Sequence, residues 1–359
     1  MDRNGKSLLV TGGCGFIGSS LVRLALARGY EILNLDKLTY AGNLFSMADV
    51  HSGFYSFLQT DICDLPLVLE AFDRFKPAGV LHLAAESHVD RSIDDPGAFV
   101  RTNIVGTHSL LQAALLYWTS LPEADRKDFR FLHVSTDEVF GSLGPEGVFH
   151  ESSRYAPRSP YAASKAASDH LVRAYGHTYG LPVLITNCSN NFGPRQFPEK
   201  LIPLAINRSI REKPIPVYGD GRQVRDWIHV GDHCDALLRV LENGRTGETY
   251  LIGGHAERSN LDVIRETCAL LDELHPRENG RRHFDLVEFV PDRPGHDRRY
   301  AMDTSKMETE IGWKPAKSFQ AGLRQTVEWY LSNQAWVEEI LSGPISLERL
   351  GRAKGEAIS

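Results

Sequence analysis

Short apolar runs alternate with longer segments of helical spacing through the first half of the chain. Each run has the length of a buried strand, and the segments between them repeat apolar residues every three or four positions. This order predicts an α/β fold with a doubly wound parallel sheet. Strands are expected at residues 7–10, 32–35, 54–58, 79–85, 129–134 and 182–186, and helices at residues 65–75, 95–118 and 159–179 and in the stretch ending at Gly29.

A glycine-rich turn, TGGCGFIG, joins the first expected strand to its helix. Gly12, Gly15 and Gly18 let backbone amides approach a pyrophosphate at the N-terminus of that helix. The second strand ends in Asp36, which is placed to bond a ribose diol and so favours NAD over NADP, although Lys37 beside it weakens that preference. A glycine turn alone can be purely structural, but this context predicts a Rossmann-type NAD-binding domain.

The apolar pattern changes near residue 190, where prolines and glycines become frequent and the alternation becomes irregular. We expect residues 1–190 to form the Rossmann domain and residues 191–340 to form mainly a smaller C-terminal domain that binds substrate. Some of these later segments are expected to return to the main sheet, and residues 341–359 to form a tail. The glycines within residues 217–221 suggest the tip of a β-hairpin.

The composition is that of an ordinary globular protein, with 42% hydrophobic and 24% charged residues. The formal net charge of −6 argues against broad electrostatic binding to nucleic acid or to an anionic membrane. No apolar run has membrane-spanning length, and the chain starts without a leader-like segment. The five cysteines are scattered without a C-x-x-C pair, which indicates free thiols and predicts a cytoplasmic protein.

Reactive side chains gather in two neighbouring segments, STDEVFG and SPYAASK. The first follows an apolar run and puts the Thr136 hydroxyl beside two carboxylates, Asp137 and Glu138. The second opens a helix on which Tyr161 and Lys165 lie four residues apart on one face. Acidic residues are common at helix starts without any catalytic role. That explanation leaves the neighbouring hydroxyl and the Tyr–Lys pair unexplained, so we predict an acid–base site.

Two histidines and three cations require a choice between structural and functional roles. His82 lies in an expected strand and His88 in the loop after it, and no third ligand stands at a suitable spacing. We therefore expect structural histidines and no metal site. Lys200, Arg225 and Arg293 would ordinarily be solvated surface charges, but the settings of the two arginines favour a fixed role such as gripping a diphosphate.

These segments together resemble the dTDP-glucose 4,6-dehydratases, a family of the extended short-chain dehydrogenase/reductase superfamily. The resemblance covers nearly the whole chain. The glycine loop and Y-x-x-x-K are typical of the superfamily, whereas Thr-Asp-Glu, LAAESHVDRS and DRPGHDRRY are narrower signals for the dehydratases. The matching segments are TGGCGFIGS, DKLTYAGN, HLAAESHVDRS, STDEVFG, SPYAASKAASDHLVRAYGHTYG, TNCSNNFGP, FPEKLIP, RDWIHVGDH, GETYLIGG and DRPGHDRRYAMD.

The resemblance implies that NAD-dependent chemistry converts dTDP-glucose into dTDP-4-keto-6-deoxyglucose and water. Tyr161, assisted by Lys165 and Thr136, would deprotonate the hydroxyl on carbon 4 during oxidation. Glu138 would then remove the proton on carbon 5 as a base, and Asp137 would protonate the departing hydroxyl on carbon 6. Tyr161 must therefore ionise about 3 pH units below a free phenol, and Asp137 needs a raised pKa.

Residue by residue, the resemblance also implies contacts with cofactor and substrate. The pattern around Thr102 leaves open whether this residue packs in a helix or touches the cofactor. The implied cofactor contacts, with the glycine loop included, are Gly12, Gly15, Phe16, Ile17, Gly18, Asp36, Lys37, Leu38, Thr39, Asp61, Ile62, Leu83, Ala84, Ala85, Ser87, Thr102, Tyr161, Lys165 and Asn191. The implied substrate contacts are Ser87, Thr136, Asn190, Lys200, Leu201, Pro216, Val217, Tyr218, Arg225, Asn260, Asp292, Arg293 and His296.

Other functions stay open at this stage. A UDP-sugar 4-epimerase or a decarboxylase needs the Tyr–Lys pair and NAD but not the two carboxylates, and a UDP-glucose 4,6-dehydratase differs mainly in its nucleobase. A non-catalytic NAD-binding protein would have no need of the whole reactive set. The resemblance also implies a homodimer that pairs long helices, for which residues 95–118 and 159–179 are the candidates.

Overall fold

The computed structural model describes residues 7–342 and is built on a seven-stranded sheet. All neighbouring strands are parallel, in the order β10-β6-β5-β4-β1-β2-β3. The doubly wound Rossmann-type sheet predicted from the sequence is therefore confirmed. Its strands are β1 (Ser7–Thr11), β2 (Glu31–Asp36), β3 (Tyr55–Gln59), β4 (Gly79–His82), β5 (Arg130–Thr136), β6 (Val183–Cys188) and β10 (Thr249–Ile252).

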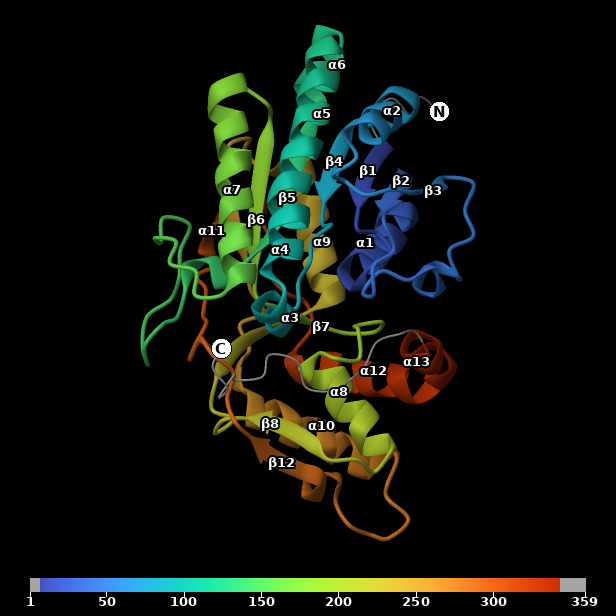
Figure 1. Ribbon diagram of the computed structural model, residues 1–359, viewed down its shortest axis with the longest axis vertical. Helices are drawn as coiled ribbons and strands as arrows, with labels where there is room; N and C mark the ends of the chain where they lie inside the picture. Colours follow the sequence, from blue (N-terminus) through green and yellow to red (C-terminus); the bar gives the residue numbers. More distant parts are fainter. Residues whose placement is uncertain (1–6, 343–359) are drawn as a thin grey trace, which may run out of the picture.

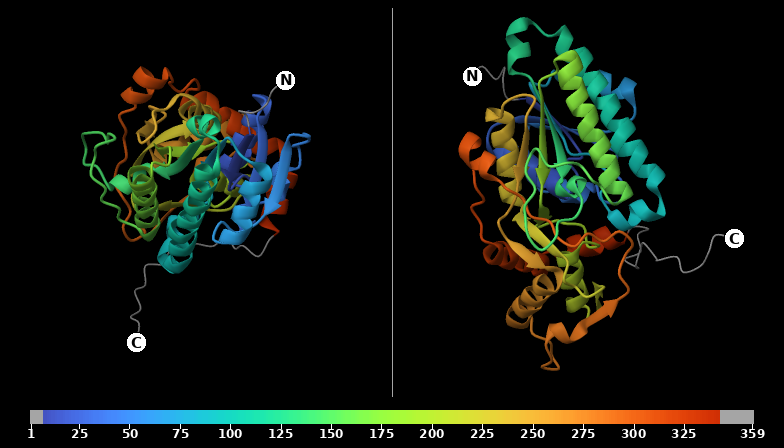
Figure 2. Two further views of the ribbon diagram at one scale, coloured as in Figure 1. Left: turned by 90° about the horizontal axis from the view of Figure 1, so that it is seen from above. Right: turned by 90° about the vertical axis from the view of Figure 1, so that its left-hand side faces the viewer.

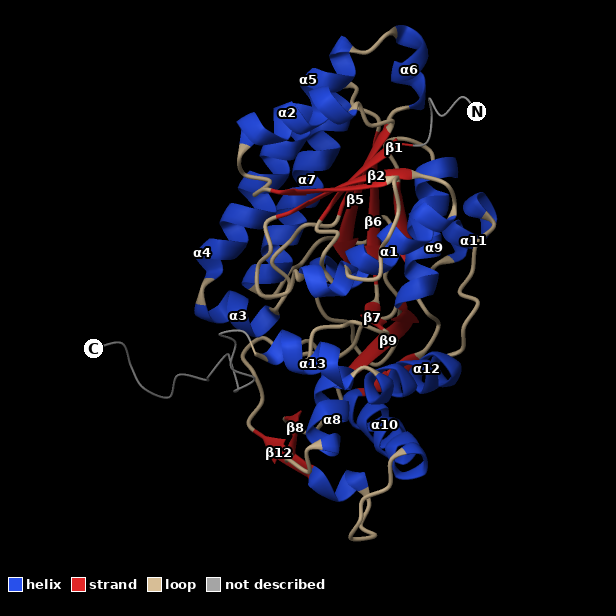
Figure 3. Cartoon of the chain, turned by 90° about the vertical axis from the view of Figure 1, so that its right-hand side faces the viewer, coloured by secondary structure: helices blue, strands red, loops and turns tan. Residues whose placement is uncertain are grey.

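Helices cover both faces of this sheet, as Figures 1 and 3 show. Alternate residues of one strand supply the two cores: Leu8 and Val10 of β1 face one layer and Leu9 faces the other. On the first face lie α1 (Phe16–Ala27), α9 (Val230–Asn243) and α11 (Ser305–Ile311), and on the second α2 (Leu65–Phe75), α5 (Thr107–Ser120) and α7 (Pro160–Tyr179).

The long helical pattern predicted for residues 95–118 is divided into three segments. Between α4 (Pro96–Phe99) and α5 lies a π-helical segment, η2 (Val100–Gly106). A Cβ on Gly106 would lie 2.7 Å from the Ile62 side chain, so a glycine lets the widened turn pack against the residues after β3. Such π-helical turns often occur at functional sites.

The elements from residue 190 onward, other than α9, β10 and α11, form a smaller lobe beyond the carboxyl ends of the sheet (Figures 1 and 2). It contains a three-stranded sheet, β11-β9-β7, and a two-stranded parallel sheet, β12-β8. Its elements are β7 (Asn190–Phe192), α8 (Leu201–Ile210), β8 (Ile215–Tyr218), β9 (Val224–His229), β11 (Glu257–Ser259), α10 (Asn260–Leu274), β12 (Val287–Val290), α12 (Phe319–Ser332) and α13 (Gln334–Leu341). The lobe also contains the short segment η4 (His283–Leu286), which packs against α10. Short helical segments elsewhere are η1 (Leu44–Met47), α3 (Val89–Asp94), α6 (Glu123–Asp128) and η3 (Asp137–Phe140).

The β-hairpin predicted around residues 217–221 is wrong. Gly219 and Gly221 do turn the chain with positive φ values of 57° and 68°. The strands on either side, however, pair with different partners: β8 with β12 and β9 with β11 and β7. Glycine marks a turn, but it carries no information on which strands meet across it.

Three elements after residue 190 belong to the Rossmann layers: β10 is an edge strand of the main sheet, and α9 and α11 cover one face. The division of the chain at residue 190 itself stays a prediction. Of the tail predicted for residues 341–359, residues 343–359 lie outside the described part of the chain.

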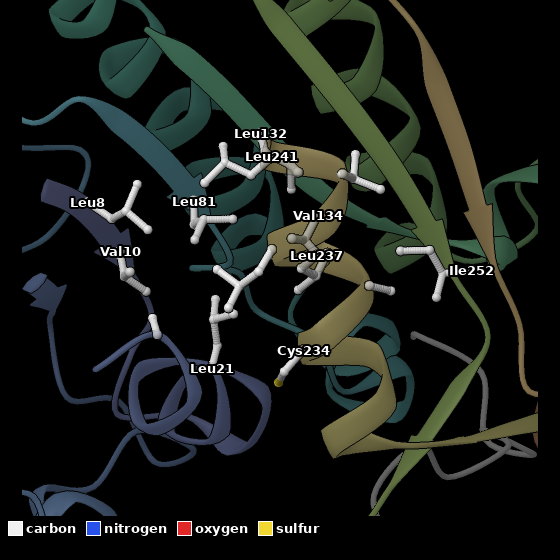
Figure 4. Packing of buried hydrophobic residues seen from close by; sticks show 14 of the residues in the cluster. Leu8, Val10, Leu21, Leu81, Leu132, Val134, Cys234, Leu237, Leu241 and Ile252 are labelled. Carbon is white, nitrogen blue, oxygen red and sulfur yellow. The ribbon is translucent and has the colours of Figure 1, made fainter. Parts of the chain in front are cut away.

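Helix α9 anchors the first core layer through Leu237, which is fully buried between α1 and the sheet (Figure 4). We expect Leu237→Ala to lower the free energy of unfolding by about 2–5 kcal/mol, because it removes buried methyl groups and leaves a cavity. The matched control is Leu67→Ala on α2, where the side chain is 39% exposed. Equal denaturation midpoints for the two variants would contradict this account of the core.

Candidate active site

Residues at the carboxyl ends of the parallel strands line a cavity. The glycine-rich turn after β1 forms part of its wall. A Cβ on Gly12 would lie 2.8 Å from the Ala84 backbone, and one on Gly18 would lie 2.1 Å from the Gly12 carbonyl oxygen. Only glycine therefore allows this turn, the start of α1 and the segment after β4 to approach so closely. The turn exposes its backbone to the cavity at the N-terminus of α1, as a pyrophosphate site requires.

Asp36 ends β2 at the rim of the same cavity. Its Oδ1 accepts a hydrogen bond from the Leu38 amide, and its Oδ2 accepts one from the Cys14 amide, both at 2.9 Å. The carboxylate thus ties the glycine turn to the second strand. Lys37 points across the cavity, where its Nζ donates to the Thr102 Oγ1 at 3.0 Å.

Most of the predicted cofactor contacts line this one cavity. Thr102, whose role the sequence left open, is among them, held there by η2. The exceptions are Leu38, which packs against the core of the sheet, and Asp61, which lies 3.7 Å from the Lys37 Nζ. The lining residues are Gly12, Gly15, Phe16, Ile17, Gly18, Asp36, Lys37, Thr39, Ile62, Leu83, Ala84, Ala85, Ser87, Thr102, Tyr161, Lys165 and Asn191.

The five predicted catalytic residues meet in this cavity. Thr136 ends β5, and its Oγ1 accepts a hydrogen bond from the Glu138 amide at 3.3 Å, which starts the short helix η3. Tyr161 and Lys165 stand on the first turns of α7, which begins where the Ser159 side chain accepts a hydrogen bond from the Ala162 amide.

The two adjacent carboxyl groups differ in their surroundings. Asp137 is buried, and its Oδ2 has no hydrogen-bond partner. Burial, and then the charge of Glu138, raises its pKa well above the usual value, which is the direction a general acid needs. Burial also raises the pKa of Glu138, but the cations Arg293, Arg225 and Lys200 oppose that rise.

The role of Lys165 in lowering the pKa of Tyr161 stays a prediction, and burial and the neighbouring acids act in the opposite direction. Burial, and then the charge of Glu138, raises the pKa of the phenol well above its usual value, against a hydrogen bond with Thr136. The Lys165 Nζ donates to the Val134 carbonyl at 2.8 Å, and burial lowers the pKa of Lys165 to about 8. Lys165, four residues along the same helix, and the positive charge of a bound nicotinamide are the two charges expected to favour the phenolate.

A second cavity adjoins the first and is lined largely by residues of the smaller lobe. The two cavities share Glu138, Asn190 and Lys200. Arg225 is 4% exposed and donates to the Asp297 carbonyl at 2.9 Å, while Arg293 lies 3.1 Å from Asp90. Thr136 lines only the first cavity, and Asp292 lines neither, because it pairs with the His296 ring at 2.6 Å. The predicted substrate contacts in its wall are Ser87, Asn190, Lys200, Leu201, Pro216, Val217, Tyr218, Arg225, Asn260, Arg293 and His296.

Sequence reasoning missed Glu199 and Tyr300, which both line the site. Glu199 borders both cavities and lies 3.3 Å from the Arg91 guanidinium. Tyr300 lies under Arg225, with 4.2 Å between the guanidinium and the ring centroid, and donates to Asp297 at 2.6 Å. Both stand inside FPEKLIP and DRPGHDRRY, so their position in those segments was the only available signal.

The two histidines weighed as metal ligands have protein partners. The His82 ring contacts the hydroxyls of Thr11 and Thr107 at 2.8 and 2.9 Å, and burial holds its pKa well below the usual value. His88 caps α3 by accepting from the Arg91 amide at 3.4 Å. Within residues 7–342 there is no group of three or more side chains suited to a metal ion, and no helix there is long and apolar enough to cross a membrane.

Comparison with known proteins identifies the family. The family model described as GDP-mannose 4,6 dehydratase matches residues 9–326. The dTDP-glucose 4,6-dehydratase of Xanthomonas campestris pv. campestris (strain B100) is 57% identical over 344 residues, 96% of this chain and 98% of that protein. That of Neisseria meningitidis serogroup B is 53% identical over 97% of this chain and 100% of its own length.

A solved structure supports the same relationship. DesIV, a dTDP-glucose 4,6-dehydratase from Streptomyces venezuelae solved with NAD bound, superimposes with a TM-score of 0.84 at 45% identity, over 93% of this chain and 99% of that one. The chain therefore belongs to the dTDP-glucose 4,6-dehydratases, within the family described as GDP-mannose 4,6 dehydratase.

Proposed function

We propose that the chain converts dTDP-glucose into dTDP-4-keto-6-deoxyglucose and water. The observation that carries this proposal is the pair Asp137 and Glu138, which lies beside Tyr161 where the cofactor cavity meets the substrate cavity. A hydride-transfer enzyme alone needs no such pair, whereas elimination of water needs both an acid and a base. Relatives of the same name cover nearly the whole chain at 53–57% identity.

NAD is the cofactor, and the close-packed glycine turn and the acid at the end of β2 fit it. When bound, NAD supplies a reversible hydride acceptor, which takes the hydride from carbon 4 of the sugar and returns it to carbon 6. The groups proposed to orient the dinucleotide are Asp36 at the ribose, the turn from Gly12 to Gly18 at the pyrophosphate, and Thr102 with Lys37 on the opposite wall.

Oxidation at carbon 4 requires a base for the hydroxyl proton. Tyr161 is proposed to take it as a phenolate, and Thr136 to hydrogen-bond the same oxygen. The ketone formed at carbon 4 acidifies the proton on carbon 5. Glu138 is proposed to remove that proton, and Asp137, whose pKa is raised by burial and by Glu138, to donate a proton to the hydroxyl leaving carbon 6.

The second cavity is proposed to hold the nucleoside diphosphate part of the substrate. Lys200, Arg225 and Arg293 line it and supply the positive charge that two phosphates require. Asn260, Pro216 and Val217 also line this cavity and are proposed to contact the thymidine. An epimerase or a decarboxylase would leave the Asp–Glu pair without a task, and a uridine-selective 4,6-dehydratase remains the nearest alternative.

We further infer a cytoplasmic homodimer. The exposed apolar side chains of Val105, Leu116 and Tyr179 support the dimer, because they lie on the neighbouring segments η2, α5 and α7 (Figure 2). All five cysteines are free, which fits a reducing compartment.

Proton NMR of the purified protein with dTDP-glucose and no added NAD tests the function directly. We expect a new methyl doublet from carbon 6, because the hydroxyl there is replaced by hydrogen and the resident cofactor is regenerated. Inversion at carbon 4 without a methyl signal would indicate an epimerase instead.

Glu138→Gln should oxidise carbon 4 but stall before water is lost, because the amide cannot take the carbon 5 proton. Methyl product should fall at least ~100-fold, while the absorbance of the reduced nicotinamide accumulates. The matched control is Glu146→Gln, at an exposed glutamate nearby in the chain. Normal turnover by Glu138→Gln would mean that Glu138 is not the base.

Arg293→Met should raise the KM for dTDP-glucose about ten- to a hundredfold, the loss expected for one charge-assisted hydrogen bond to phosphate. The change in kcat should be smaller than the change in KM. Arg298→Met is the control, because that side chain is 53% exposed and pairs with Asp220. Steady-state kinetics in which the two variants behave alike would remove Arg293 from the diphosphate site.

A further inference from the structure

A fully buried carboxylate, Asp169, stands behind the catalytic lysine and takes no part in the reaction described above. It lies four residues after Lys165 on α7, and both side chains face β5. Its Oδ2 accepts hydrogen bonds from the Tyr155 hydroxyl at 2.7 Å, the Ser135 hydroxyl at 2.9 Å and the Asn187 amide at 3.3 Å. Three donors on one oxygen fix the carboxylate and favour its ionised form.

The other oxygen of Asp169 and the Lys165 ammonium both approach the same nitrogen of the His133 ring. The His133 Nε2 lies 3.2 Å from the Asp169 Oδ1 and 3.4 Å from the Lys165 Nζ, and both His133 and Asp169 are completely buried. The contact with Asp169 Oδ1 is close in distance but is not a hydrogen bond. Burial lowers the pKa of His133 to about 4, so a neutral ring touches both opposite charges.

A buried ammonium ion without a counter-charge tends to lose its proton. Burial is the largest influence on Lys165 and lowers its pKa to about 8, and Asp169 is the first of the opposing influences. Burial would raise the pKa of Asp169, but His133 and Lys165 outweigh it and hold that pKa below its usual value. The charged and titratable groups that face the Lys165–His133–Asp169 cluster from the surrounding elements are His82 on β4, Cys188 on β6, Tyr155 before α7 and Arg173 on α7.

We propose that Asp169 is a positioning residue that keeps Lys165 charged and fixed beside Tyr161, acting across His133. This inference rests on the proposed function, since it assigns a task to a residue that does not touch the substrate. It predicts that the carboxylate sets the upper pH limit of catalysis. Above that limit Lys165 becomes neutral and no longer favours the phenolate form of Tyr161.

The test compares Asp169→Asn with Tyr155→Phe in the holoenzyme. Asp169→Asn keeps the shape and removes the charge, so the pKa of Lys165 falls and the alkaline limb of the kcat profile moves to lower pH by about one unit or more. Tyr155→Phe removes one donor but leaves the carboxylate, so it should leave that limb in place. Asp169→Glu should restore most of the alkaline limb.

A second readout needs no turnover. The absorbance of tyrosinate is followed against pH as the difference between each protein and its Tyr161→Phe counterpart. Tyr161 should ionise at higher pH in Asp169→Asn than in the unmodified holoenzyme. Loss of thermal stability with an unmoved alkaline limb and an unmoved tyrosinate titration would overturn the proposal.

The remaining outcomes are also decisive. If Asp169→Asn does not fold, Asp169→Ser provides the neutral variant, with room for water among the same donors. Failure of both to fold, while Asp169→Glu folds, would assign the carboxylate to the fold and overturn the proposal. If the unmodified enzyme gives no methyl product, the proposed function fails, yet the tyrosinate titration still tests Asp169 separately.

Discussion

Pairing of β5 with β4 on one side and β6 on the other is the constraint on which the site depends. The register sets Thr136 opposite Cys188 and brings Ser135 opposite Asn187. Because all three strands run in the same direction, their ends deliver the reactive hydroxyl, the carboxylates and the cofactor wall to one place. Helix α7 then packs against β5 and β6, which brings the phenol and the ammonium to that place.

Burial has opposite effects on the groups gathered there. It raises the pKa of Asp137, which suits an acid, but it also raises the pKa of Tyr161, which must act as a base. The site therefore needs positive charge close to the phenol. Lys165 stands four residues after Tyr161 on α7, and its Nζ bonds the Val134 carbonyl. We expect Lys165 and the cofactor to share that task.

Local patterns in the sequence predicted the parallel sheet, the glycine turn and the start of α7 well. Each depends on neighbouring residues: the apolar runs, the close approach of Gly18 to the Gly12 carbonyl, and the Ser159 cap. The pairing of β8 with β12 could not be predicted in this way, because it joins segments about seventy residues apart. Glu199 was missed for a similar reason, since a charge beside Lys200 looks solvated until Arg91 of α3 is placed against it.

The position of β10 also bears on how the protein is made. This strand pairs with β6 at the sheet edge, and α9 covers α1 and the adjacent core from the same late part of the chain. A ribosome-bound chain that has emerged only to β6 lacks both, so the face of β5 and β6 that α9 covers in the complete fold stays in water. The sheet of the cofactor domain can thus be completed only after β7, β8 and β9 of the smaller lobe have been synthesised. Folding of the two lobes is therefore coupled.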